Sequence, residues 1–565
     1  MKMTSAVLAA LAATLVIGTL HAQVAERPIP RLVQKDGRFA LFVDDAPFLI
    51  LGVEDQDLGL ESTWPSHPKD WAAMEYLHAN TIEIPIYWDQ IERQPGQFDF
   101  SSIDRLLAEA RQHHVRLILL WFATWKNGSQ HYMPEWMLLD PVRYFHAVDR
   151  NGQAVDSPSP FATASLEADK KAFAAVMGHL KAADPQRTVI MVQVENETGN
   201  WNSVRDFSPA AQKFFEAPAP PEILKAMHGK TTSPSPNWQA AFGPDADEYF
   251  NAWSVAKYVG EVAAAGKAVY PLPMDVNAAL RNPFHPGPPG EPGAPGAYES
   301  GGPTDNVLPI WKAAAPAIDI LAPDDYQGDP AAYVKELELY RRDDNPLFLP
   351  ESGCFQCDPA SGDFTRYFFT MLGLGAIGDS ESGTEPVPYL ARNFVLVGPM
   401  QREIARLNFE GKLKAVAEPT HFTGGDQGDP RQRLSFGSWN AVVTYGTARW
   451  GPSPTRWNPT PEGRALVAQL SDNQFLVAGY FCTVDFIPAG AERQRASQHI
   501  VEGTGQIPSA LIDGKWQHRQ FLRVERGIYD NGVFKLLGSQ NGDATDWGLR
   551  FGEEPVVLRV TLATY

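Results

Sequence analysis

The sequence has little cysteine and no excess of basic residues. Its 565 residues include 3 cysteines, too few for a disulfide framework, and no Cys/His spacing matches a zinc site. Lysine and arginine number 48 against 67 aspartates and glutamates, which gives a net charge of −19. A surface of this sign repels a phosphate backbone, so nucleic acid is not the expected partner. No HExxH motif is present either, and we expect no required metal and no cofactor.

Long apolar runs are scarce, and the one that stands out lies at the N-terminus. Lys2 precedes an apolar run over residues 6–18, and the small residue Ala22 follows. This order is typical of a secretory signal peptide, and the run is too short to cross about 30 Å of hydrocarbon comfortably. We predict a signal peptide over residues 1–22, no membrane segment after its cleavage, and a secreted or periplasmic protein. A retained membrane anchor is the alternative.

Residues 45–412 alternate short apolar runs with amphipathic helical patterns, which is typical of a parallel sheet with crossover helices. Strands are predicted at 48–53, 81–88, 115–122, 189–194, 272–276, 318–322, 346–350 and 374–377. Helices are predicted between them at 102–113, 166–182, 246–268, 331–342 and 364–372, and a last one at 393–413. Such a set of βα units predicts an α/β fold, a TIM (β/α)8 barrel, which we assign to residues 23–412.

The pattern changes after residue 413. Short strand-like runs occur at 441–445, 465–470, 475–481, 521–524, 533–537 and 556–562, and Asp513-Gly514 and Asn531-Gly532 are typical of hairpin turns. We predict an all-β C-terminal domain, a sandwich, over residues 413–565. Within the barrel, the Pro- and Gly-rich stretch 281–304 is either a solvated insertion or a lid that contacts substrate.

Carboxylates follow two of the predicted barrel strands. Glu195, Asn196 and Glu197 end the strand at 189–194, and Glu351 ends the strand at 346–350. Because residues i and i+2 share one face of a strand, Glu195 and Glu197 should point the same way, and like charges buried together raise the pKa of at least one of them. Acids from separate strands can face each other across a glycosidic bond. A solvated strand end is the alternative reading.

The segment at 192–199, VQVENETG, resembles the acid/base segment of glycoside hydrolase family 35, the β-galactosidases, whose usual form is Q-[VI]-E-N-E-Y-G. Residues 80–100 also resemble a segment of that family, and the C-terminal region resembles a β-domain found in a bacterial subgroup of it. The resemblance covers roughly residues 45–410 and extends to the clan A barrel glycosidases. It implies that Glu197 is the acid/base and Glu351 the nucleophile, and that Asn196 holds the sugar's 2-hydroxyl.

The chain departs from the family pattern at three places. Thr198 stands where the family usually has Tyr, and Thr124 stands where members commonly carry a Glu that binds galactose hydroxyls. Ile91 replaces the His before Glu92, so this segment resembles family 42 equally well. The catalytic pair is retained, whereas the identity of the sugar is less firmly implied.

Further substrate contacts are expected at strand ends. The resemblance implies that Tyr326 donates a hydrogen bond to the nucleophile; a tyrosine packed at the rim of the core is the alternative. Trp125 and Tyr87 could stack on a pyranose or simply pack, and Asn277 could contact a hydroxyl. Glu195 is counted with these substrate-binding residues. Cys354 and Cys357 form either a loop disulfide or two packed thiols.

The expected function is that of an exported, retaining exo-glycosidase. It would release terminal β-galactose from oligosaccharides or polysaccharide fragments by double displacement. Its partner would be a β-galactoside or a related oligosaccharide of the plant cell-wall type. The alternatives are the same mechanism on another β-glycoside, as in family 42, and a carbohydrate-binding barrel that has lost turnover. The oligomeric state is open, and a homodimer is compatible with the sequence.

Overall fold

The computed structural model describes residues 26–55, 68–229, 235–285, 298–353, 364–383, 387–419, 431–445, 458, 461–489, 509–512, 515–530, 532–545 and 548–564. The predicted signal peptide, Cys354 and Cys357 lie outside the described residues, as do residues 286–297 of the Pro- and Gly-rich stretch. Within the described ranges, no helix has both the length and the apolar character needed to span a membrane.

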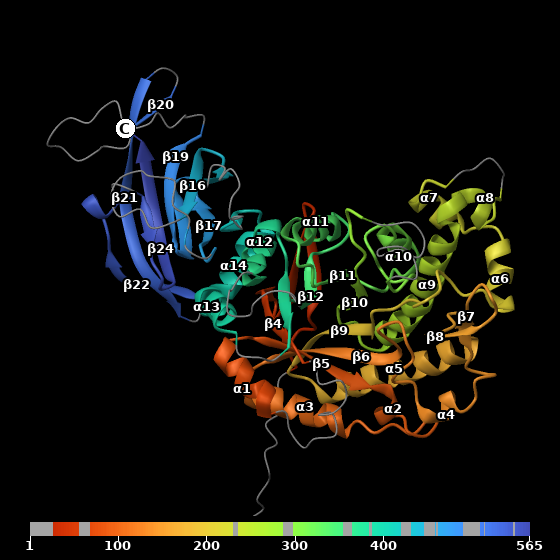
Figure 1. The fold of residues 1–565 in the computed structure, drawn as a ribbon. Coiled ribbons are helices and arrows are strands. Elements are labelled where there is room, and N and C mark those ends of the chain that lie inside the picture. Colours follow the sequence, from red (N-terminus) through yellow and green to blue (C-terminus); the bar gives the residue numbers. More distant parts are fainter. Residues whose placement is uncertain are drawn as a thin grey trace, which may run out of the picture.

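Eight parallel strands close into a barrel, which confirms the predicted fold (Figure 1). Around the barrel they are β4 (Ile50–Glu54), β5 (Thr81–Tyr87), β6 (Arg116–Lys126), β9 (Val189–Asn196), β10 (Met274–Ala279), β11 (Ile320–Asp325), β12 (Phe348–Ser352) and β13 (Gly378–Ser382). The larger helices around them are α1 (Pro68–Leu77), α3 (Ser101–Gln112), α5 (Thr163–Ala183), α9 (Ala246–Val269), α10 (Leu308–Ala314), α11 (Pro330–Tyr340), α12 (Tyr367–Leu374), α13 (Pro388–Val397) and α14 (Gln401–Phe409).

Two of the predicted elements differ from the structure. The strand predicted at 374–377 precedes β13, because Leu374 still belongs to α12 and Gly375, with φ +91°, ends that helix. The helix predicted at 393–413 is interrupted by Gly398-Pro399, so α13 and α14 are separate helices. The other predicted barrel strands overlap the observed ones.

The barrel strands are buried on both faces, which explains their nearly continuous apolar runs. On β6, Leu119 and Trp121 belong to the core beneath the helices, whereas Leu120 and Phe122 belong to the core inside the barrel. Because the middle of each strand is apolar on both faces, polar side chains are found at the C-terminal strand ends, which form the mouth of the barrel.

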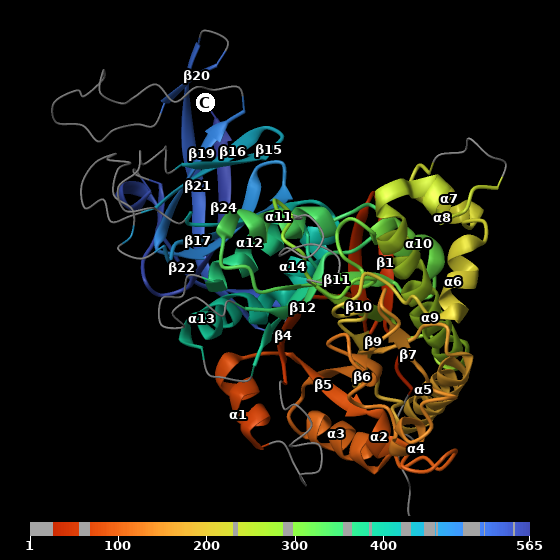
Figure 2. The ribbon, with the colours of Figure 1, turned by 45° about the vertical axis from the view of Figure 1, so that its right-hand side comes forward.

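Smaller elements decorate the barrel. After β5 and β6 come α2 (Trp88–Ile91), α4 (Glu135–Leu138) and the antiparallel pair β7 (His146–Val148) and β8 (Ala154–Pro158). After β9 come α6 (Pro209–Glu216), α7 (Pro221–Ala226) and α8 (Trp238–Phe242). These insertions extend the side of the barrel away from the C-terminal sheets (Figures 1 and 2).

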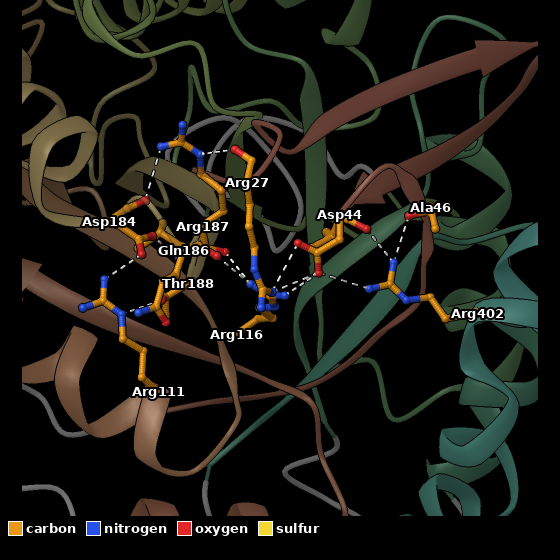
Figure 3. A network of polar contacts seen from close by, with 12 residues as sticks. Arg27, Asp44, Ala46, Arg111, Arg116, Asp184, Gln186, Arg187, Thr188 and Arg402 are labelled. Atoms are coloured by element: carbon orange, nitrogen blue, oxygen red, sulfur yellow. Dashed lines mark hydrogen bonds and ion pairs between the residues drawn. The ribbon is translucent and has the colours of Figure 1, made fainter. Parts of the chain in front are cut away.

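A three-stranded antiparallel sheet precedes the barrel: β1 (Arg31–Lys35), β2 (Arg38–Val43) and β3 (Ala46–Phe48). Leu41 and Phe48 join the core inside the barrel, so the sheet covers the end at which the strands begin. Figure 3 shows the polar network at this end, in which Asp44 Oδ2 accepts a hydrogen bond from Arg116 Nη2 at 2.6 Å and Arg402 donates to the carbonyl of Ala46 at 2.9 Å. The network fixes the sheet's orientation rather than adding much stability, because its ion pairs are partly exposed.

The C-terminal region is built from two antiparallel sheets, as predicted. The larger contains β14 (Leu413–Ala417), β17 (Arg464–Ser471), β18 (Gln474–Tyr480), β24 (Val556–Thr564), β21 (Lys515–Asp530), β20 (Ser509–Ile512) and β22 (Val533–Ser539). The smaller contains β15 (Gln432–Phe436), β16 (Trp439–Tyr445), β19 (Cys482–Pro488) and β23 (Leu549–Phe551). Hairpin pairing occurs where the turn motifs predict it, with Ile512 opposite Lys515 and Asp530 opposite Val533.

The larger sheet is buried on both faces at β17 and β18. Val467 and Val477 pack into the core between the two sheets, whereas their neighbours Leu466 and Leu476 belong to the core of the barrel helices. The Tyr480 hydroxyl donates a hydrogen bond to Asn393 Oδ1 of α13 at 2.6 Å. The sandwich therefore packs directly on the barrel, beside α12 and α13 (Figures 1 and 2).

Candidate active site

The backbone bends sharply where β9 ends. Glu195 and Glu197 have φ values of +65° and +42°, in the left-handed region that residues with a Cβ rarely adopt. Gly199 has φ +134°, and a Cβ there would lie 2.7 Å from the carbonyl oxygen of Ser300. Strained backbone of this kind concentrates at functional sites. It also ends the strand alternation after Val194.

Three carboxylates meet at the mouth of the barrel. One oxygen each from Glu197, Asp324 and Glu351 lies within 4.8 Å of the other two. Asp324 and Glu351 are 3% and 7% exposed, and Glu197 is more open than either. The structure therefore brings together Glu197 and Glu351, 154 positions apart in the chain. Among the described residues this group could also hold a metal ion; that none is required remains a prediction.

Asn277 of β10 connects the two acids. Its Oδ1 accepts a hydrogen bond from the backbone N–H of Glu197 at 2.9 Å. Its Nδ2 lies 3.1 Å from Glu351 Oε1 and 2.9 Å from Asp324 Oδ2, and donates to these oxygens. The amide therefore sets the separation of the acids, and in this structure its hydrogen bonds are with these acids and with Asn196.

Tyr326 lies at the end of β11, beside the second acid. Its hydroxyl donates to Glu351 Oε2 at 2.8 Å, which is the contact that the family resemblance implies. The Ser382 hydroxyl is hydrogen-bonded to Tyr326 and, at 3.0 Å, to Glu54 Oε2. Glu351 is thus held from both of its oxygens, by Asn277 on one side and Tyr326 on the other.

The charges at the mouth are strongly coupled. Burial, followed by the charge of Glu351, raises the pKa of Glu197 well above its usual range. The same two causes raise the pKa of Asp324 and of Glu54. Lys126, at the end of β6, partly offsets these effects, and its ammonium lies 4.5 Å from the centre of the Phe122 ring.

Glu195 does not join this group. Its side chain is fully buried in the barrel wall, where Oε2 accepts a hydrogen bond from the Trp125 backbone N–H at 2.7 Å. Its other neighbour is Asp169 of α5, and burial followed by the Asp169 charge raises the pKa of Glu195. The prediction that Glu195 and Glu197 share one face is therefore wrong, because the left-handed backbone at Glu195 breaks the alternation. Nor is Glu195 placed to bind substrate.

The two aromatic residues expected to stack on a sugar are buried instead. Trp125 is 0% exposed, its indole N–H donates to the Gly199 carbonyl at 3.1 Å, and its ring meets Tyr258 edge to face. Tyr87 is 3% exposed and packs against Phe122 inside the barrel. Both predictions of stacking fail because Trp125 is buried in the core beneath the helices and Tyr87 in the core inside the barrel.

Asn196 is also fully buried, but it borders the site. Its Oδ1 lies 3.1 Å from Gln193 Nε2 and 3.2 Å from Asn277 Nδ2, and accepts from both. Its Nδ2 donates to Asn127 Oδ1 at 3.1 Å. These bonds fix the side chain beside the acids, while its contact with a sugar hydroxyl remains a prediction.

Several residues at the mouth were not predicted from the sequence. Glu54 and Asp324 follow buried strands as Glu351 does, so the same strand-end signal could have found them. Lys126 ends the longest barrel strand. Glu299 and Trp201 lie in loops, and no sequence pattern marks them.

Comparison with known proteins yields two family matches. Residues 61–255 match a family model of glycoside hydrolase family 42, described as β-galactosidase, and residues 390–552 match a domain of unknown function, DUF5597. The first match includes Glu197 but ends before Glu351. No curated protein matches the chain.

The solved structures that match the chain share little sequence with it. The crystal structure of β-galactosidase from the psychrophilic Marinomonas ef1 has a TM-score of 0.46 at 14% identity, over 63% of this chain and 61% of that one. β-Galactosidase from Bacillus circulans sp. alkalophilus has a TM-score of 0.42 at 15% identity, over 60% and 50%. The exo-β-1,4-mannosidase Op5Man5 from Opitutaceae bacterium strain TAV5 has a TM-score of 0.37 at 15% identity, over 67% and 63%. The chain thus spans between half and two thirds of the length of these proteins.

The barrel, the facing acids and the family match make the chain similar to the glycoside hydrolases of family 42. The match is with family 42, so the resemblance to family 35 is not supported, and the segment around Ile91 that resembles both families fits family 42.

Proposed function

We propose that the chain is a retaining exo-β-galactosidase of the family 42 type. The observation that carries this proposal is the short distance between the acids, with carboxylate oxygens of Glu197 and Glu351 within 4.8 Å. Retaining glycosidases hold their two carboxyl groups about 5–5.5 Å apart, whereas inverting enzymes need about 6.5–9.5 Å to admit a water between them. The spacing supports direct attack by one carboxylate on the sugar.

In the first step, Glu351 attacks the anomeric carbon while Glu197 protonates the leaving oxygen. Because its pKa is raised, Glu197 keeps its proton to higher pH than an ordinary glutamate does, and it can donate that proton as a general acid. Asn277 and Tyr326 hold the two oxygens of Glu351 in a fixed orientation. The products are a covalent glycosyl-enzyme and the free leaving group.

In the second step, Glu197 takes a proton from water, which attacks the glycosyl-enzyme. Forming the ester removes the charge of Glu351, one of the causes of the raised pKa of Glu197. Glu197 then exists as the anion that a general base requires. Two displacements at one carbon return the original configuration.

The natural substrate is proposed to be a terminal β-galactoside of an oligosaccharide or polysaccharide fragment, of the plant cell-wall type. The signal-peptide pattern of residues 1–22 supports action outside the cytoplasm. The same mechanism on another β-glycoside is the rival, and a panel of aryl β-glycosides with different sugars separates the two. Absence of hydrolysis across the panel would favour a binding-only barrel.

Azide rescue tests the roles of the two acids. With an aryl β-galactoside that has a good leaving group, Glu197→Ala should form the glycosyl-enzyme and then stall, because no base remains to activate water. Added azide should restore turnover and give the β-galactosyl azide. Glu351→Ala should give the α-azide, because azide attacks the substrate directly.

Glu195→Gln is the matched control, since it alters a buried acid two residues away and should turn over without azide. The opposite azide anomers would reverse the assignment. Full activity in both alanine variants would show that the reaction occurs elsewhere.

A further inference from the structure

Trp201 and Glu299 lie beside Glu197, on the side of the mouth formed by β6 and β9. The two backbone hydrogen bonds between Asn200 and Ser300, at 2.8 and 3.1 Å, join the loop after β9 to the segment that carries Glu299. Glu351 is carried by β12, three strands away from β9 around the barrel. Because Glu197 protonates the leaving oxygen, groups on its side of the mouth are next to the leaving group.

Glycine allows these loops to pack closely. A Cβ at Gly128 would lie 2.6 Å from Trp201 Cδ1 and 3.0 Å from Glu299 Cγ, so both side chains cover this glycine. The Gly128 N–H in turn donates to the carbonyl of Glu197 at 2.8 Å. Trp201 is therefore placed directly over the backbone that carries the acid.

One hydrogen bond and one packing contact fix the Trp201 ring. Its indole N–H donates to the Asn127 carbonyl at 2.9 Å, and the Glu299 side chain lies beside the ring where both cover Gly128. Trp201 is partly exposed, whereas Glu299 is 2% exposed behind it. Glu299 Oε2 has no hydrogen-bond partner in the described structure, so it retains capacity for a donor.

We propose that Trp201 is the platform of a leaving-group subsite, on which a second pyranose stacks, and that Glu299 is the positioning residue that holds the indole there. The ligand class is a β-galactoside whose leaving group is itself a sugar. A fixed, partly exposed indole offers apolar area to the face of a pyranose with little loss of side-chain entropy. The proposal rests on the proposed function.

The test compares a β-galactosyl disaccharide with an aryl β-galactoside. The readout is the ratio of kcat/KM for the disaccharide to kcat/KM for the aryl substrate, which does not depend on the fraction of folded enzyme. We expect this ratio to fall about 10-fold or more in Trp201→Ala and to be largely restored in Trp201→Phe. Glu299→Gln should lower the ratio about 3-fold or more, mainly through KM.

Trp136→Ala is the matched control, because Trp136 is partly exposed and donates to the Glu92 carbonyl at 3.1 Å outside the site. Its ratio should equal that of the wild type. An unchanged ratio in Trp201→Ala, or equal losses on both substrates, would overturn the subsite, as would a wild type that cleaves only the aryl substrate. A wild type that cleaves neither substrate would contradict the proposed function itself.

Discussion

Glu195, near the end of β9, and Glu197, directly after this strand, belong to two different buried clusters of acids, and the two clusters differ in what surrounds them. Glu195 meets Asp169 in the barrel wall, and Glu197 meets Glu351 and Asp324 at the mouth. In each cluster burial is the first cause of the raised pKa values, and a neighbouring carboxylate adds to the effect for Glu195 and Glu197. A raised pKa therefore does not distinguish the wall from the active site.

The two clusters are distinguished by their solvent exposure and by their hydrogen-bond partners. Glu195 and Asp169 are both 0% exposed, and they accept hydrogen bonds from the wall, including the Trp125 N–H and the Thr124 hydroxyl. Glu197 is partly open and faces acids that come from other strands. Perturbed acids mark a candidate site only when a substrate can reach them.

The largest expected effect contrasts one acid from each cluster. Glu351→Gln removes the nucleophile and should lower kcat for an aryl β-galactoside about 10⁴-fold or more. Glu195→Gln keeps an acceptor for the Trp125 N–H, and should lower kcat less than about 10-fold. Steady-state kinetics on both variants, with far-UV circular dichroism as a check of folding, measures the contrast. Losses of similar size would place the wall cluster within the catalytic machinery.

The sequence could predict the barrel because its strands are buried on both faces. Continuous apolar runs such as 189–194 therefore marked all but one of them. The exception, β13, reads GDSES and contains no apolar run, since its residues line the mouth and the close contact with β4. Only the tertiary pairing with β12 and β4 identifies this segment as a strand.

Within the site, the sequence could locate acids but not their directions. Glu197 and Glu351 were predicted because each ends an apolar strand, whereas the direction of Glu195 depends on a left-handed φ that no pattern reveals. Trp201 and Glu299 depend on loop packing over Gly128, which joins segments far apart in the chain. The buried state of Trp125 follows from its contacts with Gly199 and Tyr258, which are equally non-local.

The next effect concerns the pH dependence of the rate. Activity requires protonated Glu197, so kcat/KM should fall as pH rises through its raised pKa. Glu299 is one of the charges that raise this pKa, so Glu299→Gln should move the alkaline limb of the profile to lower pH. Glu195→Gln should leave the limb in place, because it belongs to the other cluster. The apparent pKa of this alkaline limb belongs to the interacting acids as a group and not to Glu197 alone.

Profiles of kcat/KM against pH for an aryl β-galactoside measure these positions. A limb that moves to higher pH in Glu299→Gln, or that moves equally in Glu195→Gln, would contradict the separation of the two clusters.

The smallest expected effect is on the pH dependence of stability, and it comes from the cluster of Glu195 and Asp169 in the barrel wall. Burial and the charge of Asp169 raise the pKa of Glu195 in the folded chain. At a pH between the pKa of the unfolded chain and that of the folded chain, Glu195 is therefore protonated in the folded state and ionised in the unfolded state. Stability should therefore fall as pH rises through this window, by up to about 1.4 kcal/mol per pH unit for a fully buried group. Other buried acids contribute in the same direction, among them Asp275, whose pKa burial raises to about 8.

The Glu195 share of this slope is isolated by substitution. Glu195→Gln cannot ionise, so its Tm should decline less between pH 5 and pH 8 than the wild-type Tm does. Glu167→Gln is the control, because Glu167 lies on α5 with Asp169 but its side chain is 63% exposed, and its Tm should follow the wild type. Differential scanning calorimetry at several pH values gives the comparison. Parallel curves for Glu195→Gln and the wild type would mean that Glu195 stays ionised in the folded wall, with its charge balanced there by other groups.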